Sequence, residues 1–202
     1  MHSALAGFLT GMSLIVAIGA QNAYVLRLGL TRQHVGLAVA LCAVSDVVLI
    51  VAGIAGIGSL VRTFPSALEV LKWIGVTYLV GYALRSLWRA RRTEVLLPSD
   101  AEQPSARMVA VTTLAFTLLN PHVYLDTVLL LGSIGNQYGS SRWVFAAGAS
   151  VASIVWFCGL GFGAKAASRL MARPITWRIL DVAIGLIMIV VAVSVAMTDI
   201  AR

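Results

Sequence analysis

Charged side chains are scarce in this chain. Only 11% of its 202 residues are Asp, Glu, Lys or Arg, and 59% are hydrophobic, whereas soluble domains hold about 25% and about 45–50% of these classes. Such a composition excludes a disordered chain, a nucleic-acid binder and an ordinary soluble enzyme, because too little polar surface is left for water to wet. The sequence therefore predicts an integral membrane protein whose apolar surface is covered by the lipid bilayer.

Cysteine and metal-binding patterns are also sparse. Cys42 and Cys158 each lie within an apolar run, where a free cysteine usually acts as a small buried hydrophobe. His122 and Asp126 are four residues apart, but no third metal ligand accompanies them. No phosphate-binding loop follows a predicted strand, so we expect no metal, no cofactor and no nucleotide.

Long apolar runs, by contrast, fill the chain. A helix needs about 20 apolar residues to cross the hydrocarbon core, and six runs qualify: 4–30, 36–61, 67–88, 108–135, 143–167 and 175–198. The first basic residue is Arg27, so the basic start of a cleaved secretory signal is missing and we expect a retained first span. The sequence predicts an all-α protein with six transmembrane helices, in which a polar basic linker (89–107) separates a first half (4–88) from a second (108–198).

Basic residues fall unevenly on the two sides of this arrangement. The first, third and fifth connections with their flanks carry eleven Lys and Arg residues, and the opposite side carries four. Because basic loops stay in the cytoplasm, this asymmetry predicts both termini outside. A first segment that did not fully span would move one terminus to the other side, and that alternative stays open.

The two halves resemble each other in sequence. Tyr24 matches Tyr124 at an offset of 124 − 24 = 100, Asp46 matches Ser153 at 153 − 46 = 107, and Lys72 matches Asp181 at 181 − 72 = 109. The offsets grow in order, as small insertions would produce. Three spans per half is an odd number, so the second half would lie inverted. This pattern predicts a 3+3 inverted repeat, which is a transporter architecture.

The first and fourth apolar runs each contain a polar, helix-weakening interruption. Gly19 and the residues up to Asn22 interrupt the first, and Asn120-Pro121-His122 interrupts the fourth. Pro121 removes a backbone hydrogen bond and disfavours helix at Asn120. Paired breaks in matching positions indicate a transporter binding site, with Gln21, Asn22 and Asn120 as oxygen ligands for an ammonium group. The alternative is a proline kink that only shapes the bundle.

Two carboxylates lie within apolar runs that are predicted to cross the bilayer. Asp46 is ten residues into the second run, about 15 Å deep, where a charge costs about 2.5–3.5 kcal/mol. Asp126 lies within the fourth run. We expect both to bind substrate or protons, although a structural partnership with an Arg or Asn remains an alternative for Asp46. Tyr24 and Tyr124 are candidates for a substrate cation or for packing, and His122 for a proton relay or for packing at the kink.

These motifs together resemble the LysE family of basic amino-acid exporters. The resemblance rests on Gly19-Ala-Gln-Asn22, on Ser45-Asp46, and on Leu119-Asn-Pro-His-Val-Tyr-Leu-Asp-Thr127, and it covers essentially the whole chain. Related exporters of neutral amino acids typically have Pro-Gly-Pro where this chain has Gly-Ala-Gln. The resemblance implies export of L-lysine and L-arginine from a bacterial cytoplasm across the inner membrane. It also marks Asp46, Asp126, Asn22, Asn120 and Pro121 as functional positions.

Energetics favours a coupled exporter. Moving a cation out of a cell that is negative inside costs about 2.3 kcal/mol per charge per 100 mV, so we expect exchange for an entering proton. Three alternatives remain: a neutral amino-acid exporter, an intramembrane aspartyl enzyme with Asp46 and Asp126 as a dyad, and a structural or assembly factor. We expect a transporter and not an enzyme; the oligomeric state is open, with a homodimer as one alternative.

Overall fold

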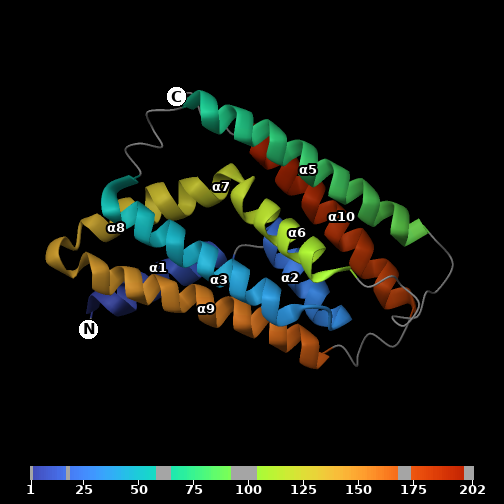
Figure 1. Cartoon of the computed structure of the whole chain (residues 1–202), viewed down its shortest axis with the longest axis horizontal. Helices are drawn as coiled ribbons and strands as arrows, with labels where there is room; N and C mark the ends of the chain where they lie inside the picture. The colour runs from blue at the N-terminus through green and yellow to red at the C-terminus, as the bar shows by residue number, and fades with distance from the viewer. Residues whose placement is uncertain (1, 17–18, 58–64, 92–103, 168–173, 198–202) are drawn as a thin grey trace.

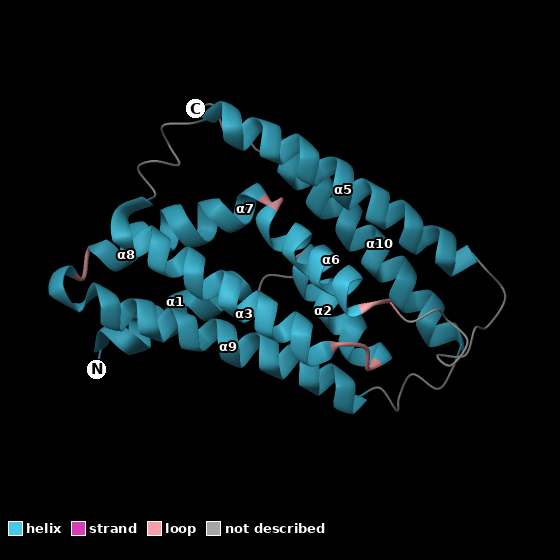
Figure 2. Cartoon of the chain, viewed as in Figure 1, coloured by secondary structure: helices cyan, strands magenta, loops and turns pink. Residues whose placement is uncertain are grey.

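A computed structural model describes residues 2–16, 19–57, 65–91, 104–167 and 174–197, and all regular structure in them is helical (Figure 2). The elements are α1 (His2–Ile15), α2 (Ala20–Thr31), α3 (Val35–Ala52), η1 (Gly53–Ile57), α5 (Pro65–Arg91), α6 (Ala106–Leu118), α7 (Pro121–Val123), η2 (Tyr124–Leu131), α8 (Gly132–Asn136), η3 (Gly139–Ser141), α9 (Arg142–Ala167) and α10 (Pro174–Met197). The expected all-α class is confirmed for this part of the chain.

Three described helices are long and apolar enough to cross a membrane: Val35–Gly56, Gly139–Ala167 and Arg178–Met197. Two bent pairs meet the same conditions together, α1 with α2 at 84° and α6 with Pro121–Asn136 at 61°. The described chain therefore offers three crossings, or up to five if each bent pair makes one. Helix α5, which fills the expected third run, is not among them, so the sixth crossing stays a prediction. The middle of the expected linker, 92–103, lies outside the described residues.

Helix α9 packs against α1, α2 and α3, and we call these four helices the bundle around α9. Helix α9 contacts both parts of the bent unit α1–α2 in the same chain direction, since Gly7 lies against Phe145 and Gly29 against Gly161. A Cβ added at Gly7 would lie 2.0 Å from the Phe145 carbonyl oxygen, so only glycine allows this approach, as in membrane helix pairs generally. Helix α9 also runs antiparallel to α3, whose Val39 lies against Gly161.

Helices α5 and α10 form an antiparallel pair along one side of the molecule (Figure 1). Arg178 Nε donates to the Ala90 carbonyl at 3.1 Å, and Leu87 packs against Gly185. We call these two helices the α5–α10 pair. It meets the remaining helices mainly through α2 and through the bend between α6 and α7, and it shares one buried hydrophobic core with α2, α3 and α6.

Candidate functional site

The break between α1 and α2 is held by one asparagine. Gly19 precedes α2 in an extended conformation. Asn22 is buried, and its Nδ2 donates to the Ile15 carbonyl on the far side of the break at 2.9 Å. Its Oδ1 accepts from Trp156 Nε1 of α9 at 3.2 Å. The expected ligand Asn22 therefore ties both sides of the break to the central helix.

Asp46 lies beside this break, in the interior of the bundle. Only 7% of the residue is exposed, and its Oδ2 accepts a 2.7 Å hydrogen bond from Ser153 Oγ of α9. One turn earlier on α3, the Cys42 thiol lies beside the side chain of Gln21, whose buried Nε2 has no hydrogen-bond partner among the described residues. Six side chains form a cluster beside the first break, which we call the first-break cluster: Gln21, Asn22, Cys42, Asp46, Ser153 and Trp156.

The second break, between α6 and α7, is closed by its own side chains. Asn120 caps α7, with its Oδ1 accepting from the His122 backbone N–H at 3.1 Å, and Pro121 occupies the first helical position, where its missing N–H costs nothing. The Tyr124 hydroxyl donates to the Leu118 carbonyl at 2.8 Å. Tyr124 therefore satisfies a backbone group that the break leaves free.

Asp126 lies on η2, a π-helical stretch that follows this break. Such stretches are rare and occur often at functional sites. The residue is half-buried, and His122 lies four residues earlier in the chain. No group of three potential metal ligands occurs among the described residues. His122 and Asp126 thus both lie on the segment that follows the second break.

Asp46 and Asp126 belong to different groups. Asp46 faces Ser153 on α9. The stretch η2, which carries Asp126, packs instead near Gly53, where α3 ends. A Cβ on Gly53 would lie 2.7 Å from the Val128 carbonyl oxygen of η2. Among the described contacts none joins the two carboxylates. The arrangement gives no support to a shared-proton pair of aspartates, the geometry that an intramembrane aspartyl enzyme would need.

An aromatic cluster fills the space between α2, α5 and α6. The buried Tyr24 ring meets Phe116 at 5.4 Å and Tyr82 at 5.9 Å between centroids, and Tyr78 meets Phe116 at 5.2 Å. The Thr112 side chain lies beside both Tyr24 and Tyr78. The sequence indicated a role for Tyr24 but not for the aromatic rings that it contacts. The four-residue spacing of Tyr78 and Tyr82 on one helix face was the available signal.

A buried ion pair was also missed. Arg27 of α2 pairs with Asp181 of α10, and Ser86 Oγ of α5 lies 3.2 Å from Asp181 Oδ1. The side chains of Arg27 and Asp181 are only 18% and 12% exposed. In the sequence Asp181 is notable only as the match of Lys72. Lys72 is itself buried, and it pairs with Glu69 at 2.7 Å.

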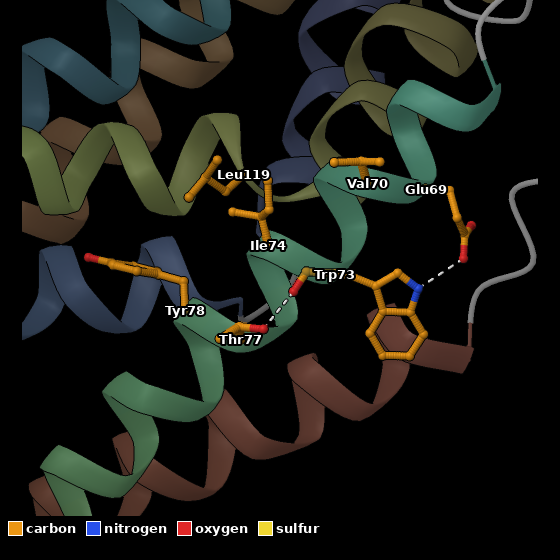
Figure 3. A pocket seen from close by; sticks show the side chains of 7 residues that line it. All are labelled: Glu69, Val70, Trp73, Ile74, Thr77, Tyr78 and Leu119. Atoms are coloured by element: carbon orange, nitrogen blue, oxygen red, sulfur yellow. Dashed lines mark hydrogen bonds between the residues drawn. The ribbon is translucent and has the colours of Figure 1, made fainter.

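An open, mostly apolar groove of about 640 Å³ runs along the outer face of α5 (Figure 3). Its lining residues are Glu69, Val70, Trp73, Ile74, Thr77, Tyr78 and Leu119. Trp73 Nε1 donates to Glu69 Oε1 at its rim at 3.1 Å. The groove contains neither Asp46 nor Asp126. It reaches the second break only through Leu119.

Comparison with known proteins identifies the family. A family model described as LysE type translocator matches residues 12–199. A putative amino-acid transporter of Mycobacterium tuberculosis is 45% identical over 188 residues, covering 93% of this chain and 94% of the relative. The lysine exporter LysE of Corynebacterium diphtheriae is 38% identical over 227 residues, covering 98% and 100%.

A third relative, the putative amino-acid transporter YggA of Aeromonas salmonicida, is 43% identical over 194 residues, covering 95% and 94%. No solved structure matches the chain significantly. All three relatives are named as transporters or exporters and none as an enzyme. The chain belongs to the LysE type translocator family and is a multi-pass membrane transport protein, not an enzyme.

Proposed function

We propose that this protein exports cationic L-amino acids, arginine and lysine, from the cytoplasm in exchange for protons. The relative from Corynebacterium diphtheriae is named a lysine exporter, and those from Mycobacterium and Aeromonas are named amino-acid transporters without a stated substrate. Family membership therefore supports amino-acid export in general. The choice of cationic substrates rests on the chemistry of Asp46.

Asp46 is the observation that carries the proposal. It is a buried carboxylate near the middle of an apolar helix, and its described partner is the neutral hydroxyl of Ser153. A buried carboxylate without a cation is costly, so it either takes up a proton or binds a positive group. One carboxylate that accepts a proton or a substrate cation, but not both at once, is what exchange at a single site requires.

Proton exchange also meets the energetic demand of export. A cationic amino acid leaving a cell that is negative inside works against about 2.3 kcal/mol per charge per 100 mV. A proton that enters for each substrate that leaves cancels this electrical cost. Substrate then leaves whenever the proton gradient exceeds its own concentration gradient.

The packing of the helices supports the proposed 3+3 inverted repeat of six spans. Under that repeat the unit α1–α2 corresponds to α6–α8, α3 to α9, and α5 to α10. The unit α1–α2 contacts α9 in the same chain direction, and the unit α6–α8 contacts α3 and η1 in the same chain direction, where Gly53 meets Val128 and Ile54 meets Gly135. The matched positions Asp46 and Ser153 touch each other, as equivalent residues near a two-fold axis do. We place the protein in the bacterial inner membrane with its basic connections in the cytoplasm.

Flux measurements on the purified protein in liposomes test this function. Labelled arginine and lysine should leave vesicles faster when a proton gradient directed into the vesicles is imposed. Labelled leucine should not respond. Rapid export of leucine with no export of arginine would instead assign the protein to neutral amino acids. Absence of any amino-acid flux from a monodisperse preparation would contradict the proposal.

A further inference from the structure

The hydroxyl of Ser153 bonds to a different helix from its own. A buried Ser or Thr in a helix commonly donates to the backbone carbonyl one turn earlier, as Thr113 and Thr117 of α6 do at 2.8 and 3.0 Å. Ser153 is fully buried on α9, but it donates to Oδ2 of Asp46 on α3 at 2.7 Å. This hydroxyl therefore serves the carboxylate and not the backbone of α9.

Close packing of α3 against α9 keeps the two side chains within reach of each other. Gly161 lies about two turns after Ser153 on α9, and Val39 lies about two turns before Asp46 on α3. A Cβ added at Gly161 would lie 2.6 Å from Val39 Cγ2, so glycine allows the two helices to approach closely. This contact helps to fix the spacing across which Ser153 meets Asp46.

The two oxygens of the Asp46 carboxylate have different surroundings. Oδ2 accepts from Ser153, whereas Oδ1 accepts no hydrogen bond from the described residues. We propose that Ser153 is a positioning residue for the exchange, which holds Oδ2 and leaves Oδ1 as the oxygen that takes up the proton or the substrate cation. This inference rests on the proposed function and names the residue that controls its central carboxylate.

A hydroxyl can keep this contact in every state of the exchange. When Asp46 is ionised, or pairs with a cation at Oδ1, Oδ2 accepts from Ser153. When a proton is bound to Oδ1, Oδ2 becomes the carbonyl oxygen of the acid and accepts the same hydrogen bond. The bond to the ionised form is the stronger one, because hydrogen bonds to charged groups exceed neutral ones in strength. Ser153 therefore favours release of the proton, which prepares Asp46 for the substrate.

The other groups near Asp46 do not replace this hydrogen bond. Cys42 lies one turn before Asp46 on α3, and its thiol is beside the neutral amide of Gln21 from α2. None of the charged residues on the helices packed against α3 forms a described ion pair or hydrogen bond with Asp46. These charged residues are Arg27, Arg107, Asp126, Arg142 and Lys165.

Infrared spectra of the purified protein measure proton uptake by Asp46 directly. A protonated carboxyl group gives a C=O stretching band that an ionised one lacks, and the band that is absent from Asp46→Asn belongs to this residue. In Ser153→Ala the midpoint of this band should move to higher pH by about one unit, the tenfold rise in proton affinity expected when one charged hydrogen bond is lost. Ser153→Thr keeps the hydroxyl and should keep the midpoint close to that of wild type.

Ser150→Ala is the matched control. Ser150 lies one turn before Ser153 on α9 and is not a described partner of Asp46, so its loss should leave the infrared midpoint unchanged. Arginine efflux from liposomes is measured across the same pH range. The pH of half-maximal efflux should move in Ser153→Ala in the same direction as the infrared midpoint, and it should stay at the wild-type value in Ser150→Ala.

The outcomes keep this inference separate from the proposed function. A Ser153→Ala protein with lower thermal stability but an unchanged midpoint would show a structural hydrogen bond and overturn the inference, as would an equal shift in Ser150→Ala. If wild type exports no arginine, the proposed function fails, and the infrared midpoints still decide whether Ser153 controls Asp46. Should Ser153→Ala fail to fold, Ser153→Cys takes its place, because a thiol is a weaker donor. Its midpoint should also move to higher pH, and an unchanged midpoint would overturn the inference.

Discussion

Ser153 of α9 donates a 2.7 Å hydrogen bond to Asp46 of α3, although the two residues are 107 positions apart in the chain. Trp156, one turn further along α9, donates to Asn22 at the first break. A single helix thus positions both the buried carboxylate and the broken helix beside it. Changes on this face of α9 should act on transport without touching the carboxylate itself.

Trp156→Phe tests whether α9 holds the first break. The substitution removes the indole N–H that donates to Asn22 Oδ1 and leaves an aromatic ring in place. Loss of this hydrogen bond should cost about 1 kcal/mol at the break and lower arginine efflux severalfold at normal abundance. Trp143→Phe, at the exposed start of the same helix, is the control. Equal efflux from both variants would leave Trp156 with a packing role alone.

Pro121→Ala tests the second break. Alanine restores a backbone N–H and permits helix at Asn120, so α6 and the helix that follows it should tend to straighten from their 61° bend. We expect reduced arginine efflux with normal insertion into the membrane. Normal efflux at wild-type abundance would show that the proline only shapes the bundle.

Gly75→Ala tests the contact between the α5–α10 pair and the second break. A Cβ at Gly75 would lie 2.0 Å from the Leu119 carbonyl oxygen, whereas one at Gly81 on the same helix meets nothing within 4 Å. Gly75→Ala should therefore destabilise the protein by about 1–3 kcal/mol. Gly81→Ala should stabilise it by up to about 1 kcal/mol. Thermal unfolding of the purified variants measures both, and destabilisation of the same size in both would rule out the close approach.

Cysteine labelling tests the topology. With both termini outside, Ser140→Cys, in the turn before α9, should react with an impermeant thiol reagent added outside intact cells. Ser99→Cys, in the basic linker and outside the described residues, should react only after the cells are opened. The native Cys42 and Cys158 are replaced beforehand by alanine. Labelling of both positions from the same side would contradict the arrangement of six spans.

Much of the fold could be predicted from composition and from a few strong local signals. The breaks were predictable because Gly19 and Pro121 weaken a helix whatever surrounds them. Described helix ends lie close to the ends of the apolar runs: α5 ends at Arg91 and its run at 88, and α6 begins at Ala106 and its run at 108. Ser105 fixes the latter by accepting from the Met108 N–H, which is an ordinary helix cap.

Less of the site could be predicted, because the residues that contact one another there come from segments far apart in the sequence. The matched repeats paired Asp46 with Ser153, but nothing in either segment indicates that they touch. Arg27 and Asp181 lie 154 positions apart, and nothing in either segment indicates that they pair. Only the packing of α10 against α2 brings the two together. The separation of Asp46 from Asp126 likewise depends on how η2 lies along the second run.

The measurement that tests the central claim most directly is proton-driven arginine efflux from liposomes containing wild-type protein or Asp46→Asn. The variant keeps the size of the side chain and can still accept from Ser153, but it can neither ionise nor take up a proton. We predict that efflux from wild type rises when a proton gradient is imposed. The variant, at equal abundance, should lose both the efflux and its response to the gradient, and Asp46→Glu should retain part of each. Normal, gradient-dependent efflux from Asp46→Asn would contradict the account, because the exchange would then not depend on this carboxylate.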